Sequence, residues 1–322
     1  MYPTILRTDA ELHILEQEMD SLNRVAHVVT TASTDAEALA REAVDAHIIL
    51  TCYTDIPARV IDAAKDLKGI VKYGVGVDAI DIEAASRNGV AVVNCPDYGS
   101  ETVADHAFAL LLGLARKIVK IDRAMRDNAW VWPAPEYLGV DLAGKTLGLL
   151  GLGRIGGAMA RRGAGFGMEC VAHDPYVSDD TARRLGIGPV GFGELLERSD
   201  FLSVHCVLTP ETRAILGQRE FKAMKDTAFL INVSRGAIAE ERALIRAIND
   251  GWIAGVGLDV FPDEPLEPDF PLLGLDNVIL TPHLAWWTEE AFDRVERETL
   301  SRITEIVDGK RPKYLKNPEI YE

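Results

Sequence analysis

The stretch from Gly144 to Asp174 reads GKTLGLLGLGRIGGAMARRGAGFGMECVAHD, and it decides the fold of the region around it. An apolar run, Thr146–Leu150, predicts a strand that enters a glycine-rich turn. The small residues of Gly157–Gly165 predict the helix that follows, and a second apolar run, Cys170–Ala172, predicts the next strand. This order of strand, turn, helix and strand is that of a βαβ unit in a parallel sheet.

The turn carries three glycines, Gly151, Gly153 and Gly156, at the spacing of a dinucleotide-binding loop. The first permits a tight turn, the second lets backbone N–H groups approach a pyrophosphate, and the third lets the helix pack close to the strand. The helix N-terminus adds partial positive charge for the phosphates. We therefore assign this loop, with Arg154 and Ile155, to cofactor binding; a merely structural βαβ turn is the alternative.

An acidic residue, Asp174, closes the second strand of the unit. A carboxylate at this place accepts both ribose hydroxyls of an adenosine. The same carboxylate would repel a 2′-phosphate, and the following Pro175–Ser178 segment contains no arginine or lysine to bind one. The sequence therefore predicts NAD as the cofactor in preference to NADP, with Pro175 beside it.

Length and composition set limits on the class of protein. A chain of 322 residues predicts about two domains. With 34 basic and 50 acidic residues the net charge is −16, which argues against nucleic acids and anionic membranes as partners. No signal peptide and no long apolar run is visible, so we expect a cytoplasmic protein. The cysteines stand singly, without metal-binding spacing, so reduced thiols are expected rather than disulfides or zinc: Cys52, Cys95, Cys170 and Cys206.

Short apolar runs alternate with helical patterns along the whole chain. Such alternation predicts α/β domains, each with a doubly wound parallel sheet. The predicted strands before the glycine-rich turn are Thr4–Arg7, Ala26–Val29, His47–Thr51, Gly69–Tyr73 and Val90–Asn94. Those after it are Phe201–His205, Ala228–Asn232, Ile253–Leu258 and Asn277–Thr281. The helical patterns include Asp35–Val44, Pro57–Lys65, Glu241–Ile248 and an amphipathic segment from Glu289 to Asp308.

One helical pattern, Glu101–Ala115, is apolar almost all round. A helix of this kind is buried, and we expect part of it to lie against a second subunit. The Trp130–Gly139 segment is a loop interrupted by prolines and carries two tryptophans. Together these segments predict a homodimer formed mainly through the cofactor domain.

Three polar residues follow predicted strands in the second half of the chain: Arg235, Glu264 and His283. Singly they could be a surface arginine, a loop glutamate and a histidine that caps a turn. Ligands of open α/β sheets bind beyond the carboxyl ends of the strands, where all three stand. A guanidinium binds a carboxylate in a bidentate fork and polarises a neighbouring carbonyl. An imidazole protonates that carbonyl, a carboxylate orients the imidazole and raises its pKa, and a nicotinamide supplies hydride.

The motifs together resemble the D-isomer-specific 2-hydroxyacid dehydrogenases, over about Gly69 to Ala291. Matching segments are KYGVGVDAID (Lys72–Asp81), ETVADHA (Glu101–Ala107), GLGRIG (Gly151–Gly156), HDPY (His173–Tyr176), NVSRG (Asn232–Gly236), GVGLDVFPDEP (Gly255–Pro265) and TPH (Thr281–His283). The resemblance implies a D-specific oxidoreductase that transfers hydride between NAD(H) and a small 2-hydroxy or 2-oxo acid. It implies that Arg235 holds the substrate carboxylate, Glu264 tunes His283, and His283 is the acid/base.

The same resemblance implies further cofactor contacts. Asp259 is implied to bind the nicotinamide carboxamide, and Thr102 a cofactor phosphate. The segment Cys206–Thr212 is implied to line the adenine and ribose side. The contacts implied within it and in the NVSRG motif are Cys206, Val207, Thr212, Val233 and Ser234.

The resemblance also implies the domain organisation. A flavodoxin-like substrate-binding domain spans residues 1–99 and 289–322, and a Rossmann NAD-binding domain spans residues 100–288. The substrate is expected in the cleft between them, where Val75 and Gly76 offer backbone N–H groups to its carboxylate. Closure about hinges near Gly99 and Trp286 would exclude water from the hydride path.

After His283 the chain continues Leu-Ala-Trp286-Trp287, which resembles the C-terminal-binding-protein branch of the family. In that branch the tryptophan reaches the substrate tail, which implicates Trp286; a core aromatic at the hinge is the alternative. The branch has an arginine where this chain has Lys72, a change that keeps the charge but loses the planar fork. Lys72 and Trp286 are expected to line the side-chain pocket.

Two other functions remain open. A phosphoglycerate-dehydrogenase-like enzyme would have an arginine after the third strand, whereas Leu50–Thr54 has no base before Arg59, and no regulatory domain is expected after Glu322. An NAD(H)-sensing, peptide-binding corepressor is the alternative from another class. The complete set of Arg235, Glu264 and His283 favours the enzyme. The identity of the 2-hydroxy acid is not determined by the sequence.

Overall fold

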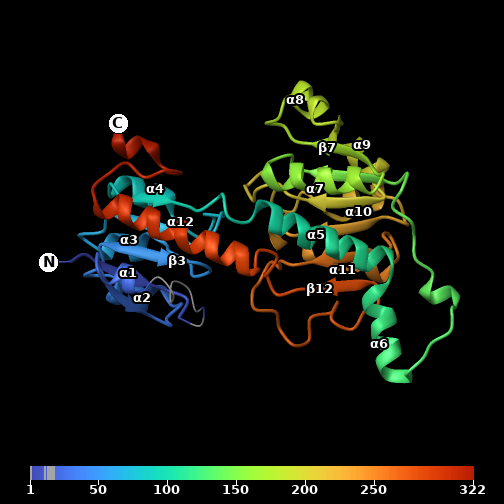
Figure 1. Ribbon diagram of the computed structural model, residues 1–322, viewed down its shortest axis with the longest axis horizontal. Coiled ribbons are helices and arrows are strands. Elements are labelled where there is room, and N and C mark those ends of the chain that lie inside the picture. Colours follow the sequence, from blue (N-terminus) through green and yellow to red (C-terminus); the bar gives the residue numbers. More distant parts are fainter. Residues whose placement is uncertain (1, 11, 13–18) are drawn as a thin grey trace. The chain divides into compact units, whose positions relative to one another are not determined.

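A computed structural model describes residues 2–10, 12 and 19–322 of the chain (Figure 1). The chain divides into two compact units, Met1–Gly99 with Thr288–Glu322, and Ser100–Trp287. Each unit is built on a parallel sheet, of five strands in the first and seven in the second. The predicted α/β class with two parallel-sheet domains is therefore confirmed. The assignment of substrate binding to the first unit stays a prediction.

The first unit has the strand order β2-β1-β3-β4-β5, which is the flavodoxin-like order. Its strands are β1 (Thr4–Arg7), β2 (His27–Thr30), β3 (Ile48–Thr51), β4 (Gly69–Lys72) and β5 (Ala91–Val93). Its helices are α1 (Met19–Leu22), α2 (Ala36–Glu42), α3 (Ala58–Ala63), α4 (Ile82–Arg87), α12 (Glu289–Val307) and the 3₁₀ turn η3 (Pro318–Tyr321).

The C-terminal helix α12 completes this unit by packing on β4. A Cβ added at Gly69 would lie 2.6 Å from Cδ1 of Ile306, so the glycine allows the helix to approach the strand closely. Past the helix, the amide of Lys316 donates to the carbonyl of Val92, and the side chain of Asn317 accepts from the Val92 amide. These contacts fasten the last residues of the chain to β5.

The second unit has the strand order β12-β11-β10-β9-β6-β7-β8. Its strands are β6 (Thr146–Leu150), β7 (Glu169–His173), β8 (Gly188–Pro189), β9 (Phe201–Val204), β10 (Phe229–Asn232), β11 (Gly255–Leu258) and β12 (Val278–Leu280). Its helices are α5 (Ser100–Ala115), α6 (Ile118–Asn128), α7 (Arg154–Gly165), α8 (Asp179–Arg184), α9 (Phe192–Arg198), α10 (Gln218–Ala223) and α11 (Glu241–Asn249), with 3₁₀ turns η1 (Pro135–Tyr137) and η2 (Gly236–Ile238).

The second sheet is buried on both faces, as a doubly wound sheet requires. Successive residues of a strand point to opposite faces. Leu149 accordingly joins the core beneath α5 and α7, whereas Leu150 joins the core beneath α9, α10 and α11. Figure 1 shows α5 and α7 running over the same face of the sheet, where they contact each other. The strand order reverses at β6, so the turn after β6 lies at the switch point where such sheets bind ligands.

Helix α5 corrects one expectation from the sequence. Most of its apolar side chains are buried against α7 and strands β10 to β12 of its own unit, so their apolarity gives no support for a second subunit. Six of the exposed apolar residues of this unit lie instead on α6 and in the following loop, which extend away from the sheet (Figure 1). They are Ile118, Val119, Trp130, Trp132, Leu138 and Val140. The homodimer itself stays a prediction.

Candidate functional site

The glycine-rich turn after β6 has the geometry of a phosphate-binding loop. Gly151 has a φ of +100°, and a Cβ there would lie 2.5 Å from the amide nitrogen of Cys206. A Cβ at Gly156 would lie 2.3 Å from the carbonyl oxygen of Gly151. Gly153, the N-cap of α7, differs from both, because a Cβ there would point into open space. The space is therefore kept clear at the helix N-terminus, where a pyrophosphate approaches the backbone.

Asp174 follows β7 and lies beside this turn. Its Oδ2 accepts from the amide of Leu152 at 2.8 Å, and its Oδ1 accepts from the amide of Tyr176 at 2.8 Å. The two amides orient the carboxylate, and each oxygen keeps a further lone pair for a hydroxyl. The arrangement fits the two ribose hydroxyls of an adenosine.

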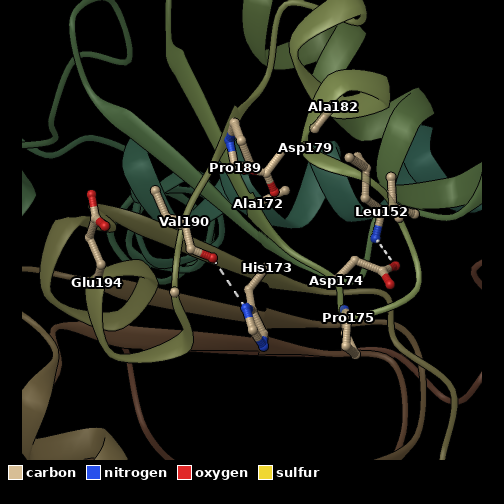
Figure 2. Close-up of a pocket in the computed structure, with 12 residues that line it drawn as sticks. Leu152, Ala172, His173, Asp174, Pro175, Asp179, Ala182, Pro189, Val190 and Glu194 are labelled. Carbon is tan, nitrogen blue, oxygen red and sulfur yellow. Dashed lines mark hydrogen bonds between the residues drawn. The ribbon is translucent and has the colours of Figure 1, made fainter.

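A pocket of about 420 Å³ opens next to Asp174 (Figure 2). It is lined by residues of the turn, of β7 and β8, and of the segments around α8 and α9: Leu152, Ala172, His173, Asp174, Pro175, Val177, Asp179, Ala182, Pro189, Val190, Gly191 and Glu194. Its charged residues are three carboxylates, Asp174, Asp179 and Glu194, and it contains neither lysine nor arginine. Figure 2 shows His173 turned toward the carbonyl of Val190, to which its Nδ1 lies at 3.1 Å. A negatively charged pocket disfavours an additional phosphate.

The predicted adenine-side segment lies beside the turn but does not line this pocket. The hydroxyl of Thr212 donates to the carbonyl of Val207 at 2.7 Å and accepts from the amide of Thr209, so the segment is closed into a turn. Ser234 donates to the carbonyl of Cys206, which ties the loop after β10 to the loop after β9. Cys206 itself lies next to Gly151.

Four other predicted cofactor residues belong to α7, to α5 and to the segment after β10. Arg154 is exposed at the first position of α7, Ile155 is half-buried, and Val233 is buried after β10. Thr102 is buried in the first turn of α5. Contacts of these residues with phosphate or ribose stay predictions.

The three predicted reaction residues follow three neighbouring strands. Arg235 follows β10, Glu264 lies in the loop after β11, and His283 follows β12. These strands are adjacent in the sheet, so their carboxyl ends meet at one edge. A Cβ at Gly236 would lie 2.0 Å from the carbonyl carbon of Phe261, which shows how closely the loops after β10 and β11 are packed.

The imidazole of His283 and the carboxylate of Glu264 form a hydrogen-bonded pair. Nδ1 lies 2.7 Å from Oε2, and Oε1 accepts from the amide of Phe261 at 2.8 Å. Partial burial opposes ionisation of Glu264, but the hydrogen bond and charge of His283, the Phe261 amide and the charge of Arg235 together lower the pKa of its carboxyl. A carboxylate opposite Nδ1 requires an N–H there, so Nε2 is the ring atom left to exchange a proton.

Arg235 is half-buried beside this pair. One guanidinium nitrogen donates to the carbonyl of Ser234 at 2.7 Å, and the carbonyl of Arg235 accepts from the side chain of Asn232 at 2.9 Å. The backbone contact holds the arginine where its charge acts on Glu264. A guanidinium carries its five N–H donors in a planar fork that matches the geometry of a carboxylate.

Asp259 is completely buried at the end of β11, and its carboxylate organises the loop that carries His283. It accepts from the hydroxyl of Thr281 at 2.6 Å and from the amides of Leu284 and Ala285 at 3.0 and 2.8 Å. Its predicted contact with the nicotinamide carboxamide stays a prediction.

Sequence reasoning did not single out His106, whose Nε2 lies 2.9 Å from the Thr281 hydroxyl. Both residues lie in quoted motifs, but spacing along the chain carries no sign of their contact.

In the first unit, three predicted substrate residues, Lys72, Val75 and Gly76, lie at the end of β4 and just after it. Lys72 is buried, and its ammonium donates to the carbonyl of Cys52. Val75 is exposed, and its carbonyl accepts from the side chain of Asn94 at 2.5 Å. This bond fixes the backbone that leads into Gly76. The proposed contacts of Val75 and Gly76 with a carboxylate stay predictions.

An unpredicted residue of the first unit, Asp9, supports the loop on which Lys72 rests. It is 3% exposed, and its carboxylate accepts from the amides of Cys52, Tyr53 and Thr54 at 2.7, 3.0 and 2.9 Å. The carbonyl that receives the Lys72 ammonium is therefore held by three charge-assisted hydrogen bonds.

The two tryptophans after His283 differ in environment. Trp286 is 7% exposed and Trp287 is 49% exposed, and their rings meet edge to face with centroids 4.8 Å apart. Burial of Trp286 is what a core aromatic would show, so its contact with substrate stays a prediction.

The four cysteines are present as thiols, and Cys52, Cys95 and Cys170 are buried. Among the described residues, no helix has both the length and the apolar character needed to span a membrane.

Comparisons with known proteins agree with this geometry. A family model described as the NAD-binding domain of D-isomer specific 2-hydroxyacid dehydrogenases matches residues 108–285. The glyoxylate reductase of Korarchaeum cryptofilum is 42% identical over 279 residues, which are 86% of this chain and 84% of that protein. The D-3-phosphoglycerate dehydrogenase of Archaeoglobus fulgidus is 44% identical over 244 residues, 76% of this chain but 46% of that longer protein.

A solved structure extends the likeness to both units. The D-lactate dehydrogenase of Aquifex aeolicus, complexed with NAD and lactic acid, superposes with a TM-score of 0.86 at 28% identity, covering 98% of this chain and 97% of that one. These comparisons match the chain over most of its length. The same chain contains the glycine-rich turn, the carboxylate after β7 and the polar residues after β10, β11 and β12. The chain belongs to the D-isomer specific 2-hydroxyacid dehydrogenases, a family of NAD-linked oxidoreductases.

Proposed function

We propose that this enzyme interconverts a small 2-oxo acid and the corresponding D-2-hydroxy acid, with Arg235, Glu264 and His283 as its reaction centre. The observation that carries the proposal is the 2.7 Å contact between Nδ1 of His283 and Oε2 of Glu264 at the edge of the sheet where Arg235 also lies. This contact engages Nδ1 with the glutamate, and Nε2 is the ring atom that acts as an acid or a base.

Each side chain has a separate role in reduction. Arg235 binds the substrate carboxylate through its guanidinium fork and withdraws electron density from the adjacent carbonyl. His283 gives the proton at Nε2 to the carbonyl oxygen, while Glu264 balances the charge of the imidazolium. The bound nicotinamide supplies the hydride that the carbonyl carbon receives. In oxidation, His283 accepts the hydroxyl proton at the same atom.

The cofactor is held by the turn after β6 and by Asp174. The open space at Gly153 and the N-terminus of α7 suit the pyrophosphate, and the oriented carboxylate suits the ribose. Because Asp179 and Glu194 also line the adjoining pocket, we propose that NADH is preferred over NADPH. Both neighbours add negative charge where a 2′-phosphate would have to be accommodated.

The substrate is proposed to be a short, unphosphorylated 2-oxo acid. Glyoxylate is the substrate named for one similar protein and lactic acid is the ligand of another. A phosphorylated substrate needs a base, and the loop after β3 offers none between Leu50 and Thr54. Arg59, the next base, pairs with Glu37 at 2.7 Å. The phosphoglycerate-dehydrogenase-like alternative is therefore the less favoured one.

The test is a panel of 2-oxo acids with NADH, followed by absorbance loss, and of D- and L-lactate with NAD. The panel contains glyoxylate, pyruvate, hydroxypyruvate and 3-phosphohydroxypyruvate. We expect turnover of the unphosphorylated acids and oxidation of D-lactate but not L-lactate. The His283→Ala variant should lose about 10²–10⁴-fold in kcat, the usual contribution of general acid catalysis, while NADH binding by fluorescence is unchanged.

The control is His27→Ala, because His27 is an exposed histidine on β2. It should keep the activity of the parent enzyme. If His283→Ala keeps most of its turnover, or if the parent oxidises only L-lactate, the proposed function is wrong.

A further inference from the structure

Helix α5 approaches β11 and β12 unusually closely because glycines stand at the contact. A Cβ at Gly257 would lie 3.0 Å from Cβ of Leu110, and a Cβ at Gly113 would lie 2.8 Å from Cδ1 of Ile279. His106 lies one turn before Leu110, on the same face of the helix. Its imidazole is therefore brought to the carboxyl ends of the two strands, where it meets Thr281.

The hydrogen bonds from His106 to Asp259 have a defined direction. The Thr281 hydroxyl lies 2.6 Å from Oδ1 of Asp259 and 2.9 Å from Nε2 of His106. An ionised carboxylate only accepts, so the hydroxyl proton goes to Asp259. The hydroxyl oxygen then accepts from an N–H at Nε2 of His106. The imidazole is also near the aspartate itself, with Nε2 3.6 Å from Oδ1.

Asp259 in turn determines the backbone of the catalytic histidine. Three successive amides converge on it: the His283 amide donates to its carbonyl at 2.7 Å, and the Leu284 and Ala285 amides donate to its carboxylate. His283 has a φ of +54°, a left-handed conformation that residues other than glycine adopt at a cost. The contacts with Asp259 hold this conformation and so direct the imidazole toward Glu264.

We propose that His106 is a positioning residue for His283, acting through Thr281 and Asp259 without touching the substrate. The proposal rests on the proposed acid/base role of His283. The His106 N–H fixes the Thr281 hydroxyl on Asp259. Loss of this hydrogen bond loosens the loop of residues 281–285, so that His283 can leave its left-handed conformation. The fraction of enzyme with a correctly oriented Nε2 then falls, which lowers kcat and leaves cofactor binding intact.

The test uses a removing and a conserving variant at each of two positions. His106→Leu and Thr281→Val remove the hydrogen bond between His106 and Thr281. His106→Gln places an amide donor near the position that Nε2 has in the parent enzyme, and Thr281→Ser keeps the hydroxyl. We expect each removing variant to lower kcat about tenfold, the effect of losing a hydrogen bond in a charged network, with the KM for NADH unchanged. Each conserving variant should recover most of that loss.

The double variant His106→Leu/Thr281→Val separates coupling from general damage. Two residues of one chain of bonds act non-additively, so its kcat should match that of either single variant rather than the product of the two losses. Thermal unfolding of all the variants is measured alongside. Parent-like kcat in His106→Leu overturns the proposal, and so does a loss in His106→Gln as large as that in His106→Leu.

The proposed function is judged separately by His283→Ala. An inactive His283→Ala together with a fully active His106→Leu contradicts only the positioning role. An active His283→Ala contradicts the proposed function itself.

Discussion

Nδ1 of His283 lies 2.7 Å from Oε2 of Glu264, and the other oxygen of that carboxylate is held by the amide of Phe261. The pair joins the loop after β12 to the loop after β11. Its hydrogen bond and the charge of the histidine contribute to the lowered pKa of Glu264, so the carboxyl is ionised throughout the neutral range. The imidazolium form of His283 consequently has a permanent counter-charge.

We predict that Glu264→Gln lowers kcat for reduction by about tenfold, because a neutral amide retains the hydrogen-bonding shape without the charge. The measurement is kcat for reduction at neutral pH. Glu267→Gln is the control, because Glu267 is exposed in the same loop. A parent-like kcat in Glu264→Gln would contradict the role of the pair.

Cofactor preference is predicted to depend on Asp174. Asp174→Ala removes the charge that faces a 2′-phosphate, so the ratio of kcat/KM with NADPH to that with NADH should rise by about tenfold, equivalent to 1.4 kcal/mol. NADH affinity should fall, since the ribose loses its acceptor. Asp180→Ala is the matched control, because Asp180 belongs to α8 but does not line the pocket. Comparable efficiency of the parent enzyme with NADPH and NADH would contradict the preference.

The homodimer prediction now depends on α6 and the loop after it. Trp130 and Trp132 are 61% and 77% exposed, and their rings meet edge to face with centroids 5.9 Å apart. Large apolar side chains in water mark interaction surfaces. We expect a dimeric mass by light scattering at micromolar concentration, and a monomeric mass for the double variant Trp130→Ser/Trp132→Ser. A monomeric parent enzyme would be decisive against the dimer.

Most strands could be predicted from the sequence, and the candidate reaction residues could be located after them, because these signals are local. The apolar run of β10 predicts a strand that ends at Asn232. Arg235 follows within a few residues of that strand end. The edge strand β8 has only two residues, Gly188 and Pro189, too few for any periodic pattern. Helix α6 was not predicted, although Ile118, Ile121 and Met125 recur at helical spacing, and it buries none of its residues.

Contacts between distant segments could not be predicted in the same way. His106 and Thr281 are 175 residues apart, and their contact depends on how closely Gly113 and Gly257 let α5 approach the sheet. The burial of Trp286 is a similar case, because an aromatic pair in a sequence does not say which ring is covered. Such features depend on tertiary packing, which single-sequence patterns do not record.

Lys72 of the first unit and Trp286 of the second give a fourth prediction. The ammonium of Lys72 is bound to the Cys52 carbonyl, so its charge is fixed in place. If Lys72 and Trp286 select the substrate side chain, Lys72→Ala and Trp286→Ala should change the relative kcat/KM values across a panel of 2-oxo acids. Lys68→Ala, which alters an exposed lysine just before β4, should leave them unchanged. Unchanged relative values in the first two variants would disprove the pocket assignment and leave the roles of Arg235, Glu264 and His283 untouched.

His205, just after β9, gives a pH dependence of stability. Burial lowers the pKa of its imidazole to about 3, and its Nδ1 is buried without a hydrogen-bond partner among the described residues, while Nε2 lies 2.8 Å from the Ser203 hydroxyl. In the unfolded chain the same group titrates near 6.5. Between these two values the unfolded state binds a proton that the folded state does not. The free energy of unfolding should therefore fall by about 1.4 kcal/mol for each pH unit as the pH drops below 6.5.

His205→Gln isolates this contribution, because glutamine retains an amide near Nε2 for Ser203 but does not titrate. Chemical unfolding followed by circular dichroism gives the free energy of unfolding of both proteins from about pH 7 to about pH 4. The parent should lose stability faster than the variant over this range, by up to the slope of one titrating group. His27→Gln, a change at an exposed histidine, should follow the parent. Parallel curves for the parent and His205→Gln would show that His205 takes up its proton equally well in both states.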